Sequence, residues 1–273
     1  MRHTTWARTR RRPTRRRSMG NVLAIAHKEL RGYFVSPIAY VVLAFFSLLF
    51  GYFFVANINV MVQVSSSQFG MGGPQVVNIN EFMIRGLFGN TAVILLFVLP
   101  TVTMRAYAEE KRSGTMELLL TAPLSDLQII LGKFFGAMAL YGLMLALTLV
   151  HMGVLFWYAD PEWGSVVTGY LGLFLMGGAF ISVGLAISSM TKNQVVAAMA
   201  TFAVLLLFWI IDWIGDTAGT TTQAVLAYLS LLMHFDDFAK GVIDTKHVAY
   251  YASVITFGLF LTAKSMDTER WNG

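Results

Sequence analysis

Residues 134–159 read FFGAMALYGLMLALTLVHMGVLFWYA and contain no Asp, Glu, Lys or Arg. A helix that crosses a membrane needs about 20 consecutive, predominantly apolar residues, and this stretch is longer than that. Similar charge-free stretches lie on both sides of it along the chain, at 37–56, 86–104, 163–191, 193–211 and 247–263. Their repetition predicts an all-α polytopic membrane protein.

The composition of the whole chain agrees with a membrane protein. Of its 273 residues, 56% are hydrophobic and 13% are charged, which lies outside the range of soluble globular domains and excludes a soluble enzyme. The absence of cysteine excludes disulfides, thiolate nucleophiles and cysteine metal sites. The net charge of +5 is accounted for by eight arginines within the first 17 residues, so it does not indicate nucleic-acid binding by the rest of the chain.

We expect three consecutive segments. Residues 1–18 form a basic, disordered leader, residues 19–35 form an amphipathic elbow helix at the membrane surface, and residues 36–273 form one transmembrane domain. The six spans of this domain are expected at about 37–56, 86–108, 126–158, 165–189, 193–212 and 247–264. The stretch 217–235 is too short in its apolar part for a span, so we expect a short extracytoplasmic or re-entrant helix there, before the last span.

Capping residues predict several of the helix boundaries. Ser36 followed by Pro37 is typical of an N-cap and a first helical residue. In a capping box, a small polar residue is followed three residues later by Glu or Gln. Such boxes are predicted for Asn78 with Glu81, Ser125 with Gln128, and Thr191 with Gln194.

The positive charges predict how the spans are oriented. With six spans both termini lie on one side of the membrane, and 17 of the 20 Lys and Arg residues fall on that side, whereas Arg85, Lys240 and Lys246 fall on the other. Lys and Arg accumulate on the cytoplasmic side. We therefore expect a multi-pass protein of the bacterial cytoplasmic membrane with both termini in the cytoplasm, and no cleavable signal peptide before the first span.

The sequence carries no motif of an energy-coupling enzyme. It lacks the phosphate-binding pattern GxxxxGK[ST], the dinucleotide pattern GxGxxG and the metalloprotease pattern HExxH, so we expect no catalytic residue in this chain. The ionisable group within the apolar stretches is His151, which we assign to the outer interface beside Trp157 and Tyr158 rather than to a proton or ligand site. A secondary transporter or channel is excluded, because it needs intramembrane charge or a polar pore lining.

The segment between the second and third spans, RAYAEEKRSGTMELLLTAPL at 105–124, carries the most informative pattern. A charged helix end breaks at Gly114, a short amphipathic helix follows at 115–121, and Pro123 stops it. From the residues alone, a short rigid helix across the cytoplasmic face and an ordinary charged connector are equally open. Together with LGK at 131–133, the segment resembles the signature of ABC-2 type transporter permeases.

Two further sequences resemble one branch of that family, the gliding-motility type. They are KEL at 28–30 with Tyr33 and Phe34, and FDDFAKGVID at 235–244. The resemblance implies a membrane subunit that pairs with a second membrane domain, as a homodimer or with a paralogue, and rests on a separate ABC ATPase. ATP and Mg would be bound by that ATPase, and this chain would bind no cofactor.

The resemblance also implies which residues couple the chain to the ATPase. The three glutamates of the segment would pair with basic residues of the ATPase, two leucines would pack in its cleft, and a glycine would permit the bend. The residues of this expected coupling site are Glu109, Glu110, Arg112, Gly114, Thr115, Glu117, Leu118 and Leu119.

Glycines indicate where helices approach closely. Gly132 and Gly136 form a GxxxG pattern at the start of the third span, and Gly142 follows them. Small residues at this spacing serve packing within a subunit or a dimer interface. We favour packing inside the subunit, with the dimer interface as the alternative.

On the expected outer side, residues 224–240 are predicted to form one amphipathic helix. Its candidate residues for an outer gate, or for docking an extracytoplasmic accessory protein, are Tyr228, Leu232, Phe235, Asp236 and Asp237. A metal site formed by His234 with Asp236, Asp237 and Asp244 is disfavoured. Oxygen donors with one histidine suit copper poorly, and the spacing matches no standard motif.

The arginine-rich leader has three interpretations. It binds anionic lipid headgroups, it contacts nucleic acid, or translation begins at Met19. Its low complexity, with Trp6 as its aromatic residue, argues against sequence-specific recognition, and we expect no nucleic-acid partner. Because the family resemblance begins near Met19, we favour the third interpretation.

The sequence therefore predicts a permease subunit of an ATP-driven exporter, embedded in the lipid bilayer. The alternative is a membrane anchor that transmits an ATP-driven conformational change to an extracytoplasmic partner without transporting a solute.

Overall fold

The described part of the chain is helical. The computed structural model describes residues 15–69, 80–121, 123–159, 161–216, 226 and 228–272, and these contain no strand. The helices in chain order are α1 (Arg15–Val35), α2 (Pro37–Phe69), the π-helix η1 (Asn80–Arg85), α3 (Gly86–Thr103), α4 (Ala108–Ser113), α5 (Met116–Thr121), α6 (Asp126–Tyr158), α7 (Trp163–Met190), α8 (Gln194–Asp216), α10 (Leu231–Ala239) and α11 (Thr245–Asn272).

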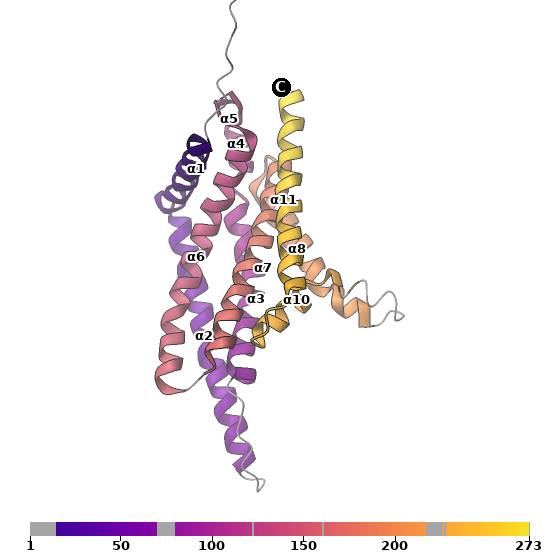
Figure 1. Cartoon of the computed structure of the whole chain (residues 1–273). Coiled ribbons are helices and arrows are strands. Elements are labelled where there is room, and N and C mark those ends of the chain that lie inside the picture. Colours follow the sequence, from indigo (N-terminus) through magenta and orange to yellow (C-terminus); the bar gives the residue numbers. More distant parts are fainter. Residues whose placement is uncertain are drawn as a thin grey trace, which may run out of the picture.

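Six segments among the described residues are long and apolar enough to cross a membrane. They are Pro37–Ser66, Met83–Ser113, Asp126–Tyr158, Trp163–Met190, Gln194–Ile211 and Thr245–Arg270. The expected all-α polytopic fold with six candidate spans is thereby confirmed. In Figure 1 the long helices run roughly parallel, and α1 and the C-terminal end of α11 lie at the same end of the bundle.

α2 departs most from its expected bounds. Its predicted span ends at 56, whereas the helix continues to Phe69. Polar side chains of this extension bond to carbonyl groups of their own helix: Asn57 Nδ2 donates to Phe53 O at 2.7 Å, and Ser65 Oγ donates to Met61 O at 2.8 Å. Apolar length predicts where a helix meets lipid, but a helix needs no apolar residue to continue. The extension projects beyond the bundle, at the end opposite α1 (Figure 1).

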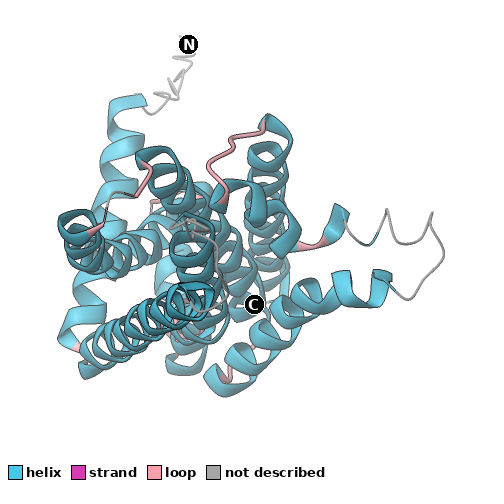
Figure 2. Cartoon of the chain, turned by 90° about the horizontal axis from the view of Figure 1, so that it is seen from below, coloured by secondary structure: helices cyan, strands magenta, loops and turns pink. Residues whose placement is uncertain are grey.

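α7 is the central helix of the bundle and contacts α3, α6, α8, α10 and α11. Of its apolar stretch 72% is buried, against 22% for α8 and for α11. A Cβ atom at Gly177 would lie 2.2 Å from the Tyr141 ring of α6, and one at Gly184 would lie 2.1 Å from Thr103 of α3. These glycines therefore allow the close helix contacts typical of membrane bundles. Seen from below, most of the long helices appear nearly end-on (Figure 2).

α1 packs along the first turns of α6. A Cβ atom at Gly132 would lie 2.5 Å from Ile25 Cβ, and one at Gly136 would lie 2.7 Å from Glu29 Cβ. The GxxxG pattern thus seats α1 on α6 within one chain, and the two helices run in the same direction because the contacts advance together along both. At Gly142 no atom lies within 4 Å of the Cβ position. α1 begins earlier than expected, at Arg15.

Two predicted caps are present. At the start of α2, Ile38 N donates to Ser36 Oγ at 3.4 Å. At the start of α6, Gln128 N donates to Ser125 Oγ and Ser125 N donates to Gln128 Oε1, which completes the capping box.

The capping box predicted for Thr191 and Gln194 is wrong. Asn193 caps α8 instead, since its Oδ1 accepts from Val195 N at 2.9 Å. Thr191 Oγ1 accepts from Asn193 N at 3.1 Å and so belongs to the connecting turn. Asn78, of the third predicted box, lies outside the described residues.

Gly184→Ala should lower the free energy of unfolding by about 1–3 kcal/mol, because the added methyl group overpacks against Thr103. Gly153→Ala is the matched control: Gly153 is exposed, and no atom lies within 4 Å of its Cβ position. The control should be neutral or stabilising by up to about 1 kcal/mol. Thermal-unfolding midpoints of both purified variants in one detergent measure the difference. Equal midpoints would contradict the close contact between α7 and α3.

Candidate functional site

The segment between α3 and α6 folds into two short helices. α4 ends at Gly114, which adopts the left-handed conformation with φ 73°. Glycine favours this conformation because it has no Cβ. Ser113 Oγ and Thr115 Oγ1 lie 2.8 Å apart across the turn, and α5 follows at once. The helix, break and second helix expected at 105–124 are therefore present.

The outward-facing side of this segment combines charged and apolar groups. Five of its exposed side chains, which we call the α4–α5 surface, are Glu109, Arg112, Thr115, Glu117 and Leu118; Ser113 and Thr121 are exposed as well. Leu118 is 72% exposed, whereas Met116 is 4% exposed and packs α5 against the core. Seven of the eight residues of the expected coupling site can be placed, and the side chain of Leu119 lies outside the described residues.

Glu110 departs from its expected role. Its Oε1 lies 2.9 Å from Lys133 Nζ and 4.0 Å from Lys28 Nζ, and its side chain is 18% exposed. An ion pair with an ATPase, expected for this glutamate, conflicts with these contacts, because the carboxylate is already engaged inside the chain. Glu109 and Glu117 are the glutamates of the segment that face outward.

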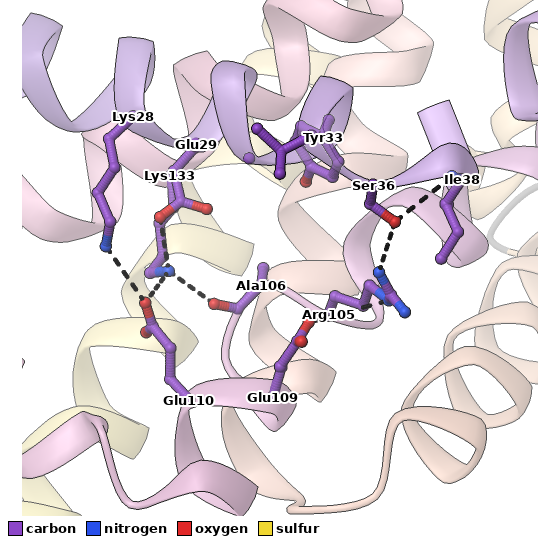
Figure 3. A pocket seen from close by; sticks show the side chains of 12 residues that line it. Lys28, Glu29, Tyr33, Ser36, Ile38, Arg105, Ala106, Glu109, Glu110 and Lys133 are labelled. Carbon is purple, nitrogen blue, oxygen red and sulfur yellow. Dashed lines mark hydrogen bonds and ion pairs between the residues drawn. The ribbon is translucent and has the colours of Figure 1, made fainter. Parts of the chain in front are cut away.

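Lys133 is the centre of a buried ion cluster (Figure 3). Its side chain is 2% exposed. Its Nζ donates to Ala106 O at 2.7 Å, to Glu110 Oε1 at 2.9 Å and to Glu29 Oε1 at 3.0 Å. An ammonium group has three N–H donors, so all of them are used. The cluster joins α1, the turn before α4, α4 itself and α6.

The cluster depends on each of its members. A buried charge is costly unless it is paired and hydrogen-bonded, and removing one partner of a buried pair costs about 3–5 kcal/mol. Without Lys133, the carboxylates of Glu29 and Glu110 would face each other. Lys28 adds a second positive charge from the exposed side, with its side chain 68% exposed.

An open cavity of about 350 Å³ lies beside the cluster, between α1 and the turn before α4 (Figure 3). At its edge Arg105 Nη1 donates to Ser36 Oγ at 3.3 Å, and the Tyr33 hydroxyl donates to Val102 O at 3.1 Å. Burial, and secondarily the charge of Glu29, raises the pKa of Tyr33 well above its usual value. The phenol therefore stays protonated and keeps its donor.

The turn before α4 is also fixed to the central helix. Ser188 Oγ, on α7, accepts from Tyr107 N and from Ala108 N, each at 3.2 Å, and donates to Met104 O at 3.0 Å. These bonds satisfy a carbonyl group at the end of α3 and two N–H groups at the start of α4, which have no partner within their own helix. A displacement of α4 would therefore disturb its hydrogen bonds to α7.

The last turns of α11 lie against the same region. Lys111 of α4, with a side chain 4% exposed, forms an ion pair with Glu269. Arg270 donates to both carboxylate oxygens of Asp126, at the start of α6, at 3.1 and 3.3 Å. α4 is thus connected to α1, α6, α7 and α11.

At the opposite end of the bundle, the predicted helix 224–240 is broken. Ser230 has an extended backbone, and its Oγ accepts from Met233 N at 3.3 Å, which caps a separate helix, α10. Because Ser230 caps the N-terminus of α10, the helix does not extend to the residues before it. The apolar pattern of the sequence does not reveal this break. Residues 224, 225 and 227 lie outside the described residues.

The apolar candidates for an outer gate or docking site differ in exposure. Phe235 is 2% exposed, and its ring lies 3.2 Å from the Cβ position of Gly172 on α7. It is therefore a core residue, and its expected surface role conflicts with this position. Tyr228 is 59% exposed and Leu232 is partly buried, so the prediction for these two residues stays open.

The acidic candidates form ion pairs. Asp236 Oδ1 lies 2.7 Å from Arg85 Nη2, and Asp237 Oδ2 lies 2.7 Å from His247 Nε2. Lys240 Nζ lies 2.5 Å from Asp236 Oδ2. In the described ranges no group of three or more His, Asp or Glu side chains is placed to hold a metal ion.

The side chain of His151 faces α2 within the helix bundle. Its ring packs edge-on against Phe50 and Phe54 of α2, with centroids 5.2 and 5.3 Å away. Trp157 and Tyr158, its expected companions, are 84% and 83% exposed. Charge-free length alone does not tell which side of a span a residue faces.

Sequence reasoning counted Lys133 among the charges of the cytoplasmic side and as part of the LGK signature at 131–133, and it missed the role of Lys133 in the ion cluster. A signal was available, because Lys133 falls four residues after Ile129 and four before Ala137, on a face of α6 whose other members are buried. A lysine on an apolar helix face needs a partner. Its partner Glu29 is 104 positions away in the chain, so helical spacing could not identify it.

The fold and this site define a polytopic helical membrane domain with an exposed pair of short helices at one end of the bundle. Residues 61–211, more than half of the chain, match the family described as ABC-2 family transporter protein, and the chain belongs to that family. It is similar to the probable multidrug ABC transporter permease YbhR of Escherichia coli strain K12 and to that of Escherichia coli O157:H7, with 25% identity over 182 residues in each case. The matches cover 60% of this chain and 48% of each relative, so the chain spans about half the length of the curated relatives it matches.

Lys133→Met should lower the free energy of unfolding by about 3–5 kcal/mol, because it leaves two partly buried carboxylates without their nearest cation. The triple variant Lys133→Met, Glu29→Gln, Glu110→Gln should recover most of this loss, because no unpaired charge is left. Thermal-unfolding midpoints in detergent provide the comparison. A triple variant as unstable as the single one would show that charge is not what holds the cluster.

Proposed function

We propose that the chain is the permease subunit of an ATP-driven exporter in the bacterial cytoplasmic membrane. A separate ATPase subunit binds and hydrolyses ATP with Mg, and this chain converts the ATPase movement into transport of a substrate. The observation that carries the proposal is the exposed α4–α5 surface, which rests on the buried cluster of Lys133. Membership of the ABC-2 family, and the printed description of the Escherichia coli relatives as multidrug permeases, support it.

The ATPase docks on the α4–α5 surface. Glu109, Arg112 and Glu117 offer charges for ion pairs, and the exposed Leu118 offers an apolar contact among them. A small apolar centre with a polar rim is typical of protein interfaces. Gly114 shapes the turn that brings both short helices onto one surface. Thr115, in the same turn, extends the polar rim.

Movement of α4 reaches the spans through short polar contacts. Glu110 holds Lys133 of α6, and Lys133 holds Glu29 of α1. Ser188 connects the preceding turn to α7. Because packed helices move as rigid bodies with discrete arrangements, a small shift of α4 moves α1, α6 and α7 together.

A second membrane domain, another copy or a paralogue, completes the translocation path. Large apolar side chains are exposed along α2, among them Phe45, Leu48 and Tyr52, and in a membrane such a face contacts lipid or a partner domain. Charge-poor spans suit an apolar or amphipathic cargo. Both termini, and with them the α4–α5 surface, lie in the cytoplasm, where ATP is available.

The second candidate function is that of a membrane anchor, which passes the ATPase movement to an extracytoplasmic accessory protein without transporting a solute. One observation favours it: α2 continues to Phe69 and projects from the bundle at the end opposite α1 (Figure 1). Transport by the purified complex in vesicles separates the two candidates.

Glu117→Lys should weaken binding of the ATPase about tenfold or more, because like charges placed opposite each other across an interface cost several kcal/mol. The measurement is affinity purification of the tagged chain from its native membranes in mild detergent, followed by mass spectrometry and an ATP-hydrolysis assay. We expect the parent chain to retain an ATPase subunit and the variant to lose it or to uncouple its hydrolysis from transport.

Asp267→Lys is the matched control. Asp267 is an exposed acidic residue on α11, near the same end of the bundle but off the α4–α5 surface, so the same reversal there should leave ATPase retention unchanged. Equal retention and coupling in the parent and in Glu117→Lys, or an equal loss in both variants, would contradict docking on the α4–α5 surface.

A further inference from the structure

Two histidines meet between α10 and the start of α11, near the end of the bundle opposite α1. Nδ1 of His234 lies 2.8 Å from Nδ1 of His247, and the residues are 3% and 4% exposed. The outer nitrogens are also engaged: His234 Nε2 lies 2.9 Å from Tyr228 O, and His247 Nε2 lies 2.7 Å from Asp237 Oδ2. The four groups form one continuous hydrogen-bonded chain.

The groups at the two ends of this hydrogen-bonded chain determine which of its nitrogen atoms carry protons. A carbonyl oxygen accepts only, so His234 Nε2 must carry a proton and donate it to Tyr228 O. In neutral His234 the other nitrogen, Nδ1, is then an acceptor. His247 Nδ1 must donate to it, and one further proton is shared between His247 Nε2 and the carboxylate of Asp237. Each of the three links thus holds one proton.

One more proton breaks the central link. If His234 is protonated, both Nδ1 atoms carry hydrogen and two donors face each other at 2.8 Å. The ring centroids are 4.9 Å apart, so two positive rings would also repel each other where little water reaches them.

The surroundings of His234 favour its neutral form. The Tyr250 ring lies 3.8 Å away and the Tyr228 ring 5.3 Å away, centroid to centroid. Burial lowers the pKa of His234 below its usual value, and the charges of His247 and Lys246 act in the same direction, whereas the Tyr228 carbonyl and Asp237 oppose them.

The other charged groups near this hydrogen-bonded chain also form ion pairs. Asp236 binds Arg85 of η1 and Lys240, and Asp244 binds Lys246. Lys240 Nζ also lies 3.9 Å from Asp237 Oδ1. From α7, Thr168 contributes an uncharged hydroxyl that donates to Phe238 O at 2.8 Å. A further proton on His234 would therefore meet no additional unpaired carboxylate among these groups.

We propose that the chain Asp237–His247–His234 is a pH-sensitive clasp, which holds α10 against α11 while His234 is neutral and releases it when His234 becomes protonated. The sign follows from linkage: the released groups with both rings protonated hold one proton more than the three links of the clasp, so the clasp loses stability as pH falls below about 6.5, the usual histidine value. Acidity on that side of the membrane would then loosen the cover that α10 forms over α7.

The test measures the distance between α10 and α11 in the full chain, reconstituted in nanodiscs. The chain contains no cysteine, so Met233→Cys on α10 and Ser253→Cys on α11, both at exposed positions, provide the two sites for spin labels. Electron–electron resonance should give a longer and broader distance distribution at about pH 5 than at about pH 7.5, the interval in which histidine titrates. The change should reverse on return to neutral pH.

Three further variants identify the group that titrates. His234→Gln and His234→Asn carry no titrating ring, so whichever distance they adopt should not change with pH. His27→Gln removes an exposed histidine of α1 and should keep the full response. Identical distributions at both pH values in the labelled parent chain would overturn the clasp, and so would a response that persists without His234 or disappears with His27. If neither His234 variant inserts, the titration of the parent chain and of His27→Gln still decides.

Discussion

A buried ammonium group holds together the end of the bundle where α1, α4 and α6 meet. The three N–H donors of Lys133 bond to three acceptors, and each acceptor comes from a different segment: Glu29 from α1, Ala106 from the turn after α3, and Glu110 from α4. Because an unpaired charge is so costly in a low-dielectric interior, these segments cannot separate without breaking the whole cluster. The exposed α4–α5 surface therefore rests on a rigid base.

In the middle of the bundle, close packing between helix backbones holds the helices together, in place of ion pairs. Helices in lipid gain little from the hydrophobic effect, so their association depends on tight packing between small residues. Gly177 and Gly184 let α6 and α3 approach α7 to distances that a methyl group would forbid. The polar contacts of Ser188 and the packing of α7 thus form one connected body, with the Lys133 cluster at one end and the two histidines at the other.

Hydropathy and local signals predicted the six spans, the break at Gly114 and the cap at Ser125, because each depends on residues adjacent in sequence. The extension of α2 to Phe69 was missed because polar residues can continue a helix by bonding to its own carbonyl groups. The sequence predicted one part of the candidate site and missed another. The outward side of α4–α5 follows from local pattern, whereas the inward turn of Glu110 depends on Lys133, whose position against α1 is set by tertiary packing.

The last turns of α11 provide a position from which movement of the α4–α5 surface can be followed. Glu269 pairs with Lys111 of α4 and Arg270 pairs with Asp126 of α6, while Thr268 in the same turn is exposed. An environment-sensitive fluorophore at Thr268 would occupy no part of the α4–α5 surface, yet it would lie on a helix bonded to α4. Such a chain would act as its own sensor, because its emission would follow the arrival of a partner subunit and each later displacement of α4 in real time.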